Sequence, residues 1–420
     1  MQSFAMPKAR YGLSHNMTYL ALIAIIWSQS MFSQYRGFLT HFPFVGDIIA
    51  PFIISVVILL LMIATYRQTR KNYAPVDLMF FILAIGIFLL NYLVFPVNEK
   101  VLNDYASPYL LGTLPFFFAG VVFDVDERTE KTIYWTSVFD LLVLAAYFLL
   151  YVQDTSYSGE TEIMEDMMGP AYAALPFILI IIRKLFTKFD ILSLILSIFG
   201  FLFLLSFGTR GPVACLLVFV LVYLLLLKKY KRPILMMSII ALVGLLIFIY
   251  IDAILEFLFP IMLKLGMGTR IIEYAQAVVL LGGQDAADTS ILERQDMMNA
   301  AFGNFTFFGH GIGSFSRVAH SEYHYSHNIV IDFLIEYGSL FGSLLLLGVI
   351  ALFYKSWKAS ENEAEKSFVL LLFCTGFVSL LFSLTYLIKP EFFFALGYCM
   401  HYIRKKKPKH SRKTSHLALT

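Results

Sequence analysis

Residues 309–342 read GHGIGSFSRVAHSEYHYSHNIVIDFLIEYGSLFG, and this stretch passes from a polar segment into a long apolar one. Three histidines, His320, His324 and His327, precede the apolar run, and two carboxylates, Asp332 and Glu336, lie inside it. Ionisable side chains at membrane depth are costly and usually mark a functional site. We therefore interpret the stretch as the wall of an active site at a membrane surface, with the rest of the chain as its scaffold.

The apolar run is expected to form one helix that begins at His327. At about 100° per residue, His327 and Gly338 share one face of such a helix, while Asp332 and Glu336 lie near the opposite face. Gly338 and Gly342 are four residues apart, a spacing that lets a neighbouring helix approach closely.

The composition of the chain is that of a membrane protein. Of its 420 residues, 59% are hydrophobic and only 15% are charged, and the mean hydropathy is +0.74. Many separate apolar runs approach the length that spans a bilayer. The net charge of +3 is too small to indicate a nucleic-acid partner. The three cysteines lie within apolar runs, at spacings that indicate neither a disulfide framework nor a metal site.

The sequence predicts an all-α fold, a polytopic bundle of about twelve transmembrane helices. The expected spans are 15–35, 47–65, 76–96, 107–123, 132–152, 170–183, 190–207, 212–227, 233–252, 327–354, 366–388 and 391–403. The chain is thereby divided into N-terminal transmembrane helices (1–252, about nine of them), a large, partly helical extracytoplasmic loop (253–326), about three C-terminal transmembrane helices (327–403) and a basic cytoplasmic tail (404–420).

Charged residues in the connections predict the orientation, because cytoplasmic loops collect Lys and Arg. With an even number of spans both termini are cytoplasmic. The basic clusters at 67–71, 128–131, 183–188 and 228–232 and the tail then all fall inside, while the loop 253–326 and the hairpin SFGTRGP around Arg210 fall outside. We expect the long loop to form short helices folded over the bundle.

Four arginines and the three histidines fall on the outer side. The planar, permanently charged fork of arginine suits bidentate contact with the phosphates of a lipid-linked pyrophosphate at the interface. Each arginine also has a simpler interpretation: Arg210 could reach the lipid headgroups, Arg270 and Arg294 could pair with Glu273 and Glu293, and Arg317 could be an ordinary surface residue.

His327 is the candidate general base, because an unperturbed histidine pKa of about 6.5 suits proton abstraction from a sugar hydroxyl. The alternative is an interfacial or capping histidine. Asn328 could hydrogen-bond the sugar. His320 and His324 have the i, i+4 spacing of a zinc pair, but a third ligand and the HExxH pattern are lacking, so no metal is expected.

Two further groups remain open to more than one interpretation. Asp332 and Glu336 could orient an arginine or a sugar, or could form a structural ion pair between helices. The glycines of GHGIGSF follow no predicted strand, so a dinucleotide site is not indicated. They are expected to form a tight turn that lets the backbone approach a ligand.

At these residues the chain resembles the O-antigen polymerase and O-antigen ligase superfamily of bacterial envelopes. The resemblance lies in the hairpin SFGTRGP with Arg210, the single large outer loop, Arg294 about fifteen residues before the glycine segment of NFTFFGHGIGSF, and His327-Asn328 followed by Gly338. It covers residues 190–355 and the overall topology. Phe341 departs from the pattern of the ligases.

The resemblance implies glycosyl transfer from undecaprenyl pyrophosphate on the outer face of the bacterial cytoplasmic membrane, without metal, cofactor or ATP. It implies catalytic roles for His327, Arg210 and Arg294, and substrate binding by Arg270, Asn328, His324, Arg317, Asp332 and Glu336. Expected partners are the lipid-linked oligosaccharide, membrane lipid, and flippase and chain-length regulator proteins. A polymerase for O-antigen, capsule or exopolysaccharide is the first expectation; a ligase-type transferase and a lipid-linked oligosaccharide flippase are the alternatives.

Overall fold

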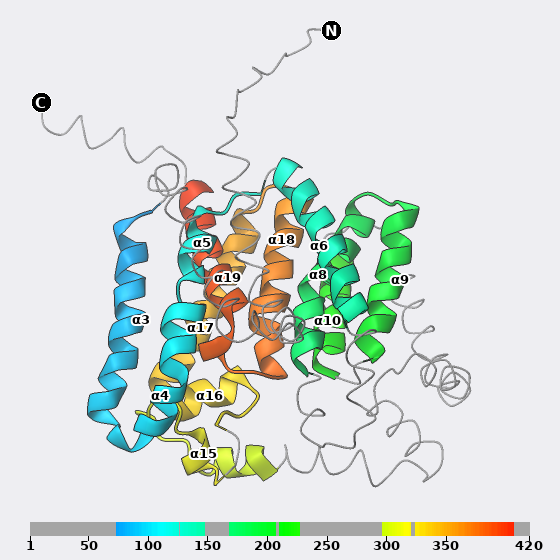
Figure 1. Cartoon of the computed structure of the whole chain (residues 1–420). Helices are drawn as coiled ribbons and strands as arrows, with labels where there is room; N and C mark the ends of the chain where they lie inside the picture. The colour runs from blue at the N-terminus through cyan, green and yellow to red at the C-terminus, as the bar shows by residue number, and fades with distance from the viewer. Residues whose placement is uncertain are drawn as a thin grey trace, which may run out of the picture.

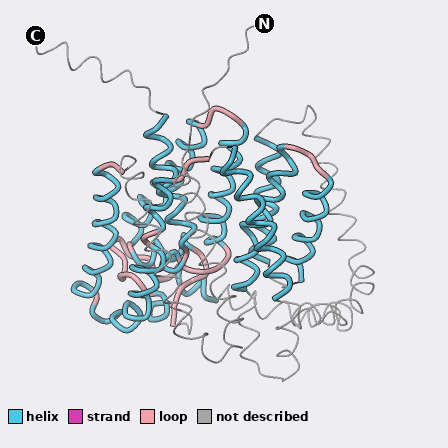
Figure 2. Tube along the Cα trace, turned by 45° about the horizontal axis from the view of Figure 1, so that its top comes forward, coloured by secondary structure: helices cyan, strands magenta, loops and turns pink. Residues whose placement is uncertain are grey.

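The computed structural model describes residues 73–125, 127–147, 168–206, 210–226, 296–320 and 324–406. Every regular element in these ranges is a helix, and Figure 2 draws them as helices joined by loops. The expected spans 15–35, 47–65 and 233–252 lie outside the described residues, as do most of the loop 253–326 and most of the basic tail.

Four helices are long and apolar enough to cross a membrane. They are α3 (Pro75–Val94), the part Pro170–Thr187 of α8 (Met168–Thr187), α17 (Gly338–Ala359), and the continuous helical segment Glu363–Leu381 that begins with α18 (Glu363–Leu372). Shorter apolar helices are α9 (Ile191–Ser206) and α10 (Arg210–Leu226). The described chain is therefore that of a multi-pass membrane protein.

Further helices in the described ranges are α4 (Glu99–Ser107), α5 (Phe116–Val122), α6 (Glu127–Tyr147), α15 (Phe315–Val318), α16 (Ile329–Glu336) and α19 (Pro390–Lys406). Residues 296–302 are also helical. In Figure 1 the long helices run side by side, whereas α4, α15 and α16 gather at one end. Large apolar side chains such as Leu83 on α3 and Leu347 on α17 remain exposed, as expected for helix faces turned to lipid.

Three expected spans differ from the helices observed. The span 107–123 is interrupted by a π-helical turn at Pro108–Thr113 before α5 begins. The span 366–388 ends at Leu381, after α18 has passed through a π-helical turn and a 3₁₀ turn. The span 327–354 is not one helix but two, α16 and α17, for a reason given with the site below.

The opposite end of the bundle is held by ion pairs around the last turn of α19. Arg404 donates to both carboxylate oxygens of Asp77, which is fully buried at the start of α3. Lys405 Nζ lies 2.7 Å from Asp124 Oδ1, and Lys406 Nζ lies 3.0 Å from Glu361 Oε2. Lysine and arginine are also favoured at a helix C-terminus by the macrodipole. This end therefore collects residues that the sequence analysis assigned to cytoplasmic connections.

Two glycines allow α5 and α19 to touch backbone to backbone. A Cβ added at Gly120 would lie 2.1 Å from the carbonyl oxygen of Phe394, and one added at Gly397 would lie 2.0 Å from that of Phe117. In lipid there is no hydrophobic driving force between helices, so van der Waals packing holds them together. Small residues at a crossing strengthen that packing because they let the two backbones approach closely.

We predict that Gly120→Ala lowers the free energy of unfolding by about 1–3 kcal/mol, because the methyl group forces the two helices apart. Thermal unfolding of the purified protein in detergent measures the loss. The matched control is Gly86→Ala on α3, where nothing lies within 4 Å. Equal unfolding temperatures for the two variants would show that α5 and α19 are not in backbone contact.

Candidate functional site

The candidate site is organised by a break between α16 and α17. Gly338 has φ +80°, a left-handed conformation that ends α16 and turns the chain into α17. The expectation that one helix places His327 and Gly338 on a common face is therefore wrong. His327 precedes α16, and the apolar pattern continues across the break because both helices are apolar on their own.

The glycine-rich segment 309–313 packs against this break. The N–H groups of His310 and Gly311 donate to the carbonyl oxygens of Ile335 and Glu336, at 2.8 and 3.0 Å. A Cβ at Gly309 would lie 2.4 Å from the nitrogen of Gly338. The glycines let the backbone approach α16 and α17, while the expected approach to a ligand stays a prediction.

Two asparagines hold the same segment from the other side. Asn91 of α3 accepts a hydrogen bond from the N–H of Ile312 at 2.8 Å, and Asn98 donates to the carbonyl of His310 at 3.0 Å. A Cβ at Gly311 would lie 2.5 Å from the ring of Phe95. The segment is thus a polar layer between the α3–α4 corner and the α16–α17 break.

The two carboxylates of α16 bond to backbone and tyrosine. Glu336 accepts from the N–H of Gly313 at 2.9 Å and from the hydroxyl of Tyr386 at 2.7 Å. Asp332 accepts from the N–H of Ser326 at 2.8 Å. Within the described ranges neither carboxylate has a cationic partner, so the ion pair between helices and the orientation of an arginine are not observed. Burial disfavours the charged form of both side chains and therefore raises the pKa of the Asp332 and Glu336 carboxyls.

His327 is fixed by its neighbours in a strained backbone conformation. Its φ is +58°, which is uncommon for a residue with a side chain. Ser326 on one side is bound by Asp332, and Asn328 on the other caps α16 by accepting from the N–H of Val330 at 2.9 Å. The ring is half-buried and lies 4.6 Å from that of Tyr325. Strain of this kind persists where the surroundings over-determine it, commonly at functional sites.

The turn at 382–389, between Leu381 and α19, joins this region to α10. Asn328 Nδ2 donates to the carbonyl of Leu381 at 3.3 Å. A Cβ at Gly211, next to Arg210, would lie 3.1 Å from the Cβ of Phe382. The start of α10 at Arg210 and the start of α16 at Asn328 thus flank the same turn, which brings together two regions that the sequence analysis placed on the outer side.

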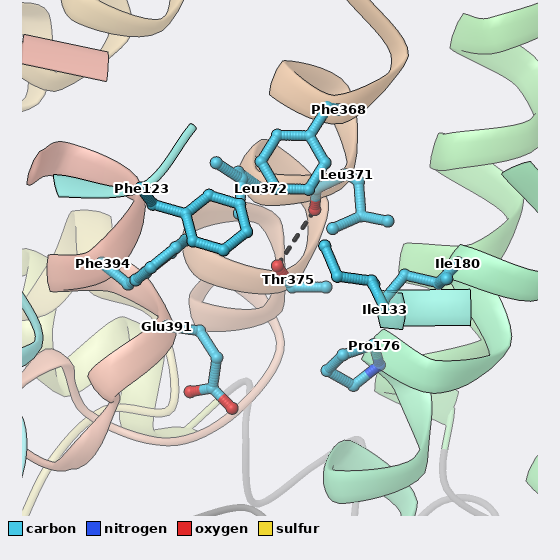
Figure 3. Close-up of a pocket in the computed structure, with 10 residues that line it drawn as sticks. All are labelled: Phe123, Ile133, Pro176, Ile180, Phe368, Leu371, Leu372, Thr375, Glu391 and Phe394. Carbon is cyan, nitrogen blue, oxygen red and sulfur yellow. Dashed lines mark hydrogen bonds between the residues drawn. The ribbon is translucent and has the colours of Figure 1, made fainter. Parts of the chain in front are cut away.

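A buried charge pair lies where this turn meets α19, and the sequence analysis did not single out either of its residues. Lys389 and Glu391 flank Pro390, with Nζ 3.4 Å from Oε2 and side chains only 5% and 8% exposed. In Figure 3, Glu391 is the one charged side chain drawn, at one end of a small cavity lined mainly by apolar residues such as Phe394 and Pro176. The signal was available, since two opposite charges flank a proline inside an otherwise apolar run.

The other candidate residues are placed less centrally or not at all. Arg270 and Arg294 lie outside the described residues. Arg317 is exposed, with Nε 3.4 Å from Asn98 Oδ1. His320 and His324 are exposed in non-helical segments, and His320 has φ +51°, so the helical zinc pair is not formed by the residues that the structure describes. In the described part of the chain, no three His, Cys, Asp or Glu side chains lie close enough together to hold a metal ion.

Chemically, this end of the bundle offers a histidine, an amide, carboxylates and tyrosine hydroxyls beside an arginine-led helix. The set can accept and donate protons and bind hydroxyl-rich or anionic groups. No protein-family model matches the chain, and neither a curated protein nor a solved structure matches it.

We predict that Gly338→Ala releases the segment 309–313, because the added Cβ would lie 2.3 Å from the carbonyl of Phe307 and φ +80° disfavours alanine. Amide hydrogen exchange at His310, Gly311 and Gly313 should accelerate. Gly348→Ala on the same helix has open space around it and is the control. Unchanged protection in Gly338→Ala would contradict the proposed docking of the segment.

Proposed function

We propose that the protein is a polyprenyl-pyrophosphate-dependent glycosyltransferase, a polysaccharide polymerase of the O-antigen, capsule or exopolysaccharide type. The observation that carries the proposal is that the starts of α10 and α16 flank one buried turn, so Arg210 and the His327-Asn328 pair belong to one end of the bundle. The order of the sequence motifs that resemble the O-antigen polymerases and ligases adds support.

In the proposed reaction, a hydroxyl oxygen of the incoming lipid-linked repeat unit forms a bond to the anomeric carbon of the growing chain. The bond from that carbon to the pyrophosphate oxygen breaks, and undecaprenyl pyrophosphate leaves with the bonding electrons. His327 takes the proton of the attacking hydroxyl. The guanidinium groups of Arg210, Arg294 and Arg270 stabilise the negative charge on the leaving pyrophosphate.

The surroundings of His327 fit the role of a positioned base. Asp332 holds the residue before it, and Asn328 after it is bound both to α16 and to Leu381. The imidazole is thus supported from both sides through the backbone. His327 is half-buried and its Nδ1 is buried, so the proposed proton transfer requires the sugar hydroxyl to reach Nε2.

The proposed location is the bacterial cytoplasmic membrane, with the site on the outer face and both termini in the cytoplasm. The end of the bundle at Arg404–Lys406, where basic residues gather, would face the cytoplasm. A lipid-linked pyrophosphate has its tail in the bilayer and its headgroup at the opposite surface, at the level of α16.

We predict that the purified protein, reconstituted with undecaprenyl-pyrophosphate repeat units, makes longer lipid-linked glycans without ATP and in the presence of chelator. His327→Ala should lower the rate about a hundred- to ten-thousand-fold, the usual cost of removing a general base. Glycan length on gels measures the product. Elongation that needs added metal, or that survives His327→Ala, would remove this mechanism, and translocation without elongation would favour a flippase.

His327→Gly separates a catalytic from a structural role. Glycine adopts φ +58° without strain, so this variant should be at least as stable as the native protein and still inactive. His320→Gly is the matched control, since His320 has φ +51° in the same loop. It should gain similar stability and keep its activity.

We predict that a single cysteine at Ser290, in a background without the three native cysteines, is labelled by an impermeant thiol reagent in intact cells. The reason is the charge bias that places 253–326 outside. A cysteine at Lys405, in the end rich in basic residues, should react only after permeabilisation. The reverse pattern would overturn both the topology and the outer location of the site.

A further inference from the structure

The turn between Leu381 and α19 is buried to an unusual degree for a connection. Ser383, Thr385, Tyr386 and Lys389 are all less than 5% exposed. Connections between helices normally run over the surface, where water satisfies their backbone. This one carries a lysine into the protein, between the start of α10 near Phe382 and Asn328 at the start of α16.

The ammonium of Lys389 is held loosely. Its Nζ lies 3.4 Å from Glu391 Oε2, beyond the usual range of a charge-assisted hydrogen bond, and 5.6 Å from the ring centroid of Tyr172. An ammonium has three donors, and among the described residues Glu391 is its ion-pair partner. A buried ion pair with such geometry contributes little to stability compared with apolar side chains of similar size, so folding alone does not explain it.

Tyr172 connects Lys389 to the start of α10. The ring of Tyr172 faces the ammonium of Lys389, and a Cβ at Gly211 would lie only 1.9 Å from the tyrosine hydroxyl. Gly211 follows Arg210, the first residue of α10. Lys389 and the arginine-led start of α10 therefore approach the same tyrosine from two sides.

We infer that Lys389 is an anion-binding residue that contacts the phosphates of a polyprenyl pyrophosphate, together with the start of α10. This inference rests on the proposed function for the identity of the lipid. Glu391 is its holding partner: it keeps the ammonium in place and competes with phosphate for it. The two residues of the pair thus act on anion binding with opposite sign.

Because removal of Lys389 and removal of the Glu391 charge should change anion binding in opposite directions, the two variants distinguish anion binding from a purely structural pair. Lys389→Met removes the cation and should weaken binding of undecaprenyl pyrophosphate to the full-length protein in detergent micelles by about tenfold or more. Glu391→Gln removes the competing carboxylate and should leave binding equal or tighter. Both dissociation constants can be measured by ligand-dependent quenching of a fluorescent label, and thermal unfolding of each variant shows how much of it is folded.

The controls separate the sources of phosphate. Lys100→Met on α4 changes an exposed lysine at the same end and should bind normally. Undecaprenol lacks the anion, inorganic pyrophosphate lacks the tail, and phosphatidylglycerol is a bulk anionic lipid. The inference expects only undecaprenyl pyrophosphate to bind tightly and to depend on Lys389.

Each contrary outcome has a definite meaning. Normal binding by Lys389→Met, or equal weakening by Lys389→Met and Glu391→Gln, would assign the pair a structural role and overturn the inference. Dependence on Lys389 that is equally strong for inorganic pyrophosphate or phosphatidylglycerol would overturn the polyprenyl ligand. Binding that depends on Lys389 in a protein that elongates no glycan would uphold the inference and reject the polymerase. Normal elongation by Lys389→Met would uphold the polymerase and reject the inference.

Discussion

The end of the bundle around α16 depends on the two hydrogen bonds that the buried carboxylate of Glu336 accepts. One oxygen accepts from the N–H of Gly313 and the other from the hydroxyl of Tyr386, so a single buried side chain joins the glycine-rich segment, α16 and the turn before α19. A buried carboxylate without such partners would cost several kcal/mol. Because its two partners come from parts of the chain on either side of α16, satisfying it requires that the segment, the helix and the turn fold together.

Several features of the end can be derived from that requirement. The segment 309–313 can reach Glu336 only if backbone approaches backbone, which needs glycine at 309 and 338. The turn can present Tyr386 only if it enters the bundle, and it then carries Lys389 inward with it. The buried lysine and the broken helix are in this sense linked consequences of one polar network among apolar helices.

The sequence predicted what depends on local pattern. Hydropathy located α3, α8, α9, α10 and α19 to within a few residues, because each of these helices carries a long apolar run. The break at Gly338 could not be predicted, since it is imposed by contact with residues 307–309, which belong to a separate segment of the chain. The burial of Lys389 was missed although a local signal existed, since Lys389 and Glu391 flank Pro390 inside an otherwise apolar run. The position of His327 and Asn328 at the start of an apolar helix could be predicted, because a polar pair before an apolar run is a local signal.

The distribution of charge bears on the choice between a transferase and a transporter. A transporter requires polar groups that lead from one surface to the other near the middle of the membrane. Here the ion pairs of Arg404 and Lys405 close one end, and the cavity between that end and Glu391 is lined by side chains such as Phe123, Phe368 and Leu371. Asp140, in the interior of α6, is buried, but a single carboxyl does not form a path. In the described part of the chain His327, Glu336 and Lys389 lie toward the same end of the bundle, an arrangement that supports the proposed chemistry on a headgroup at that surface.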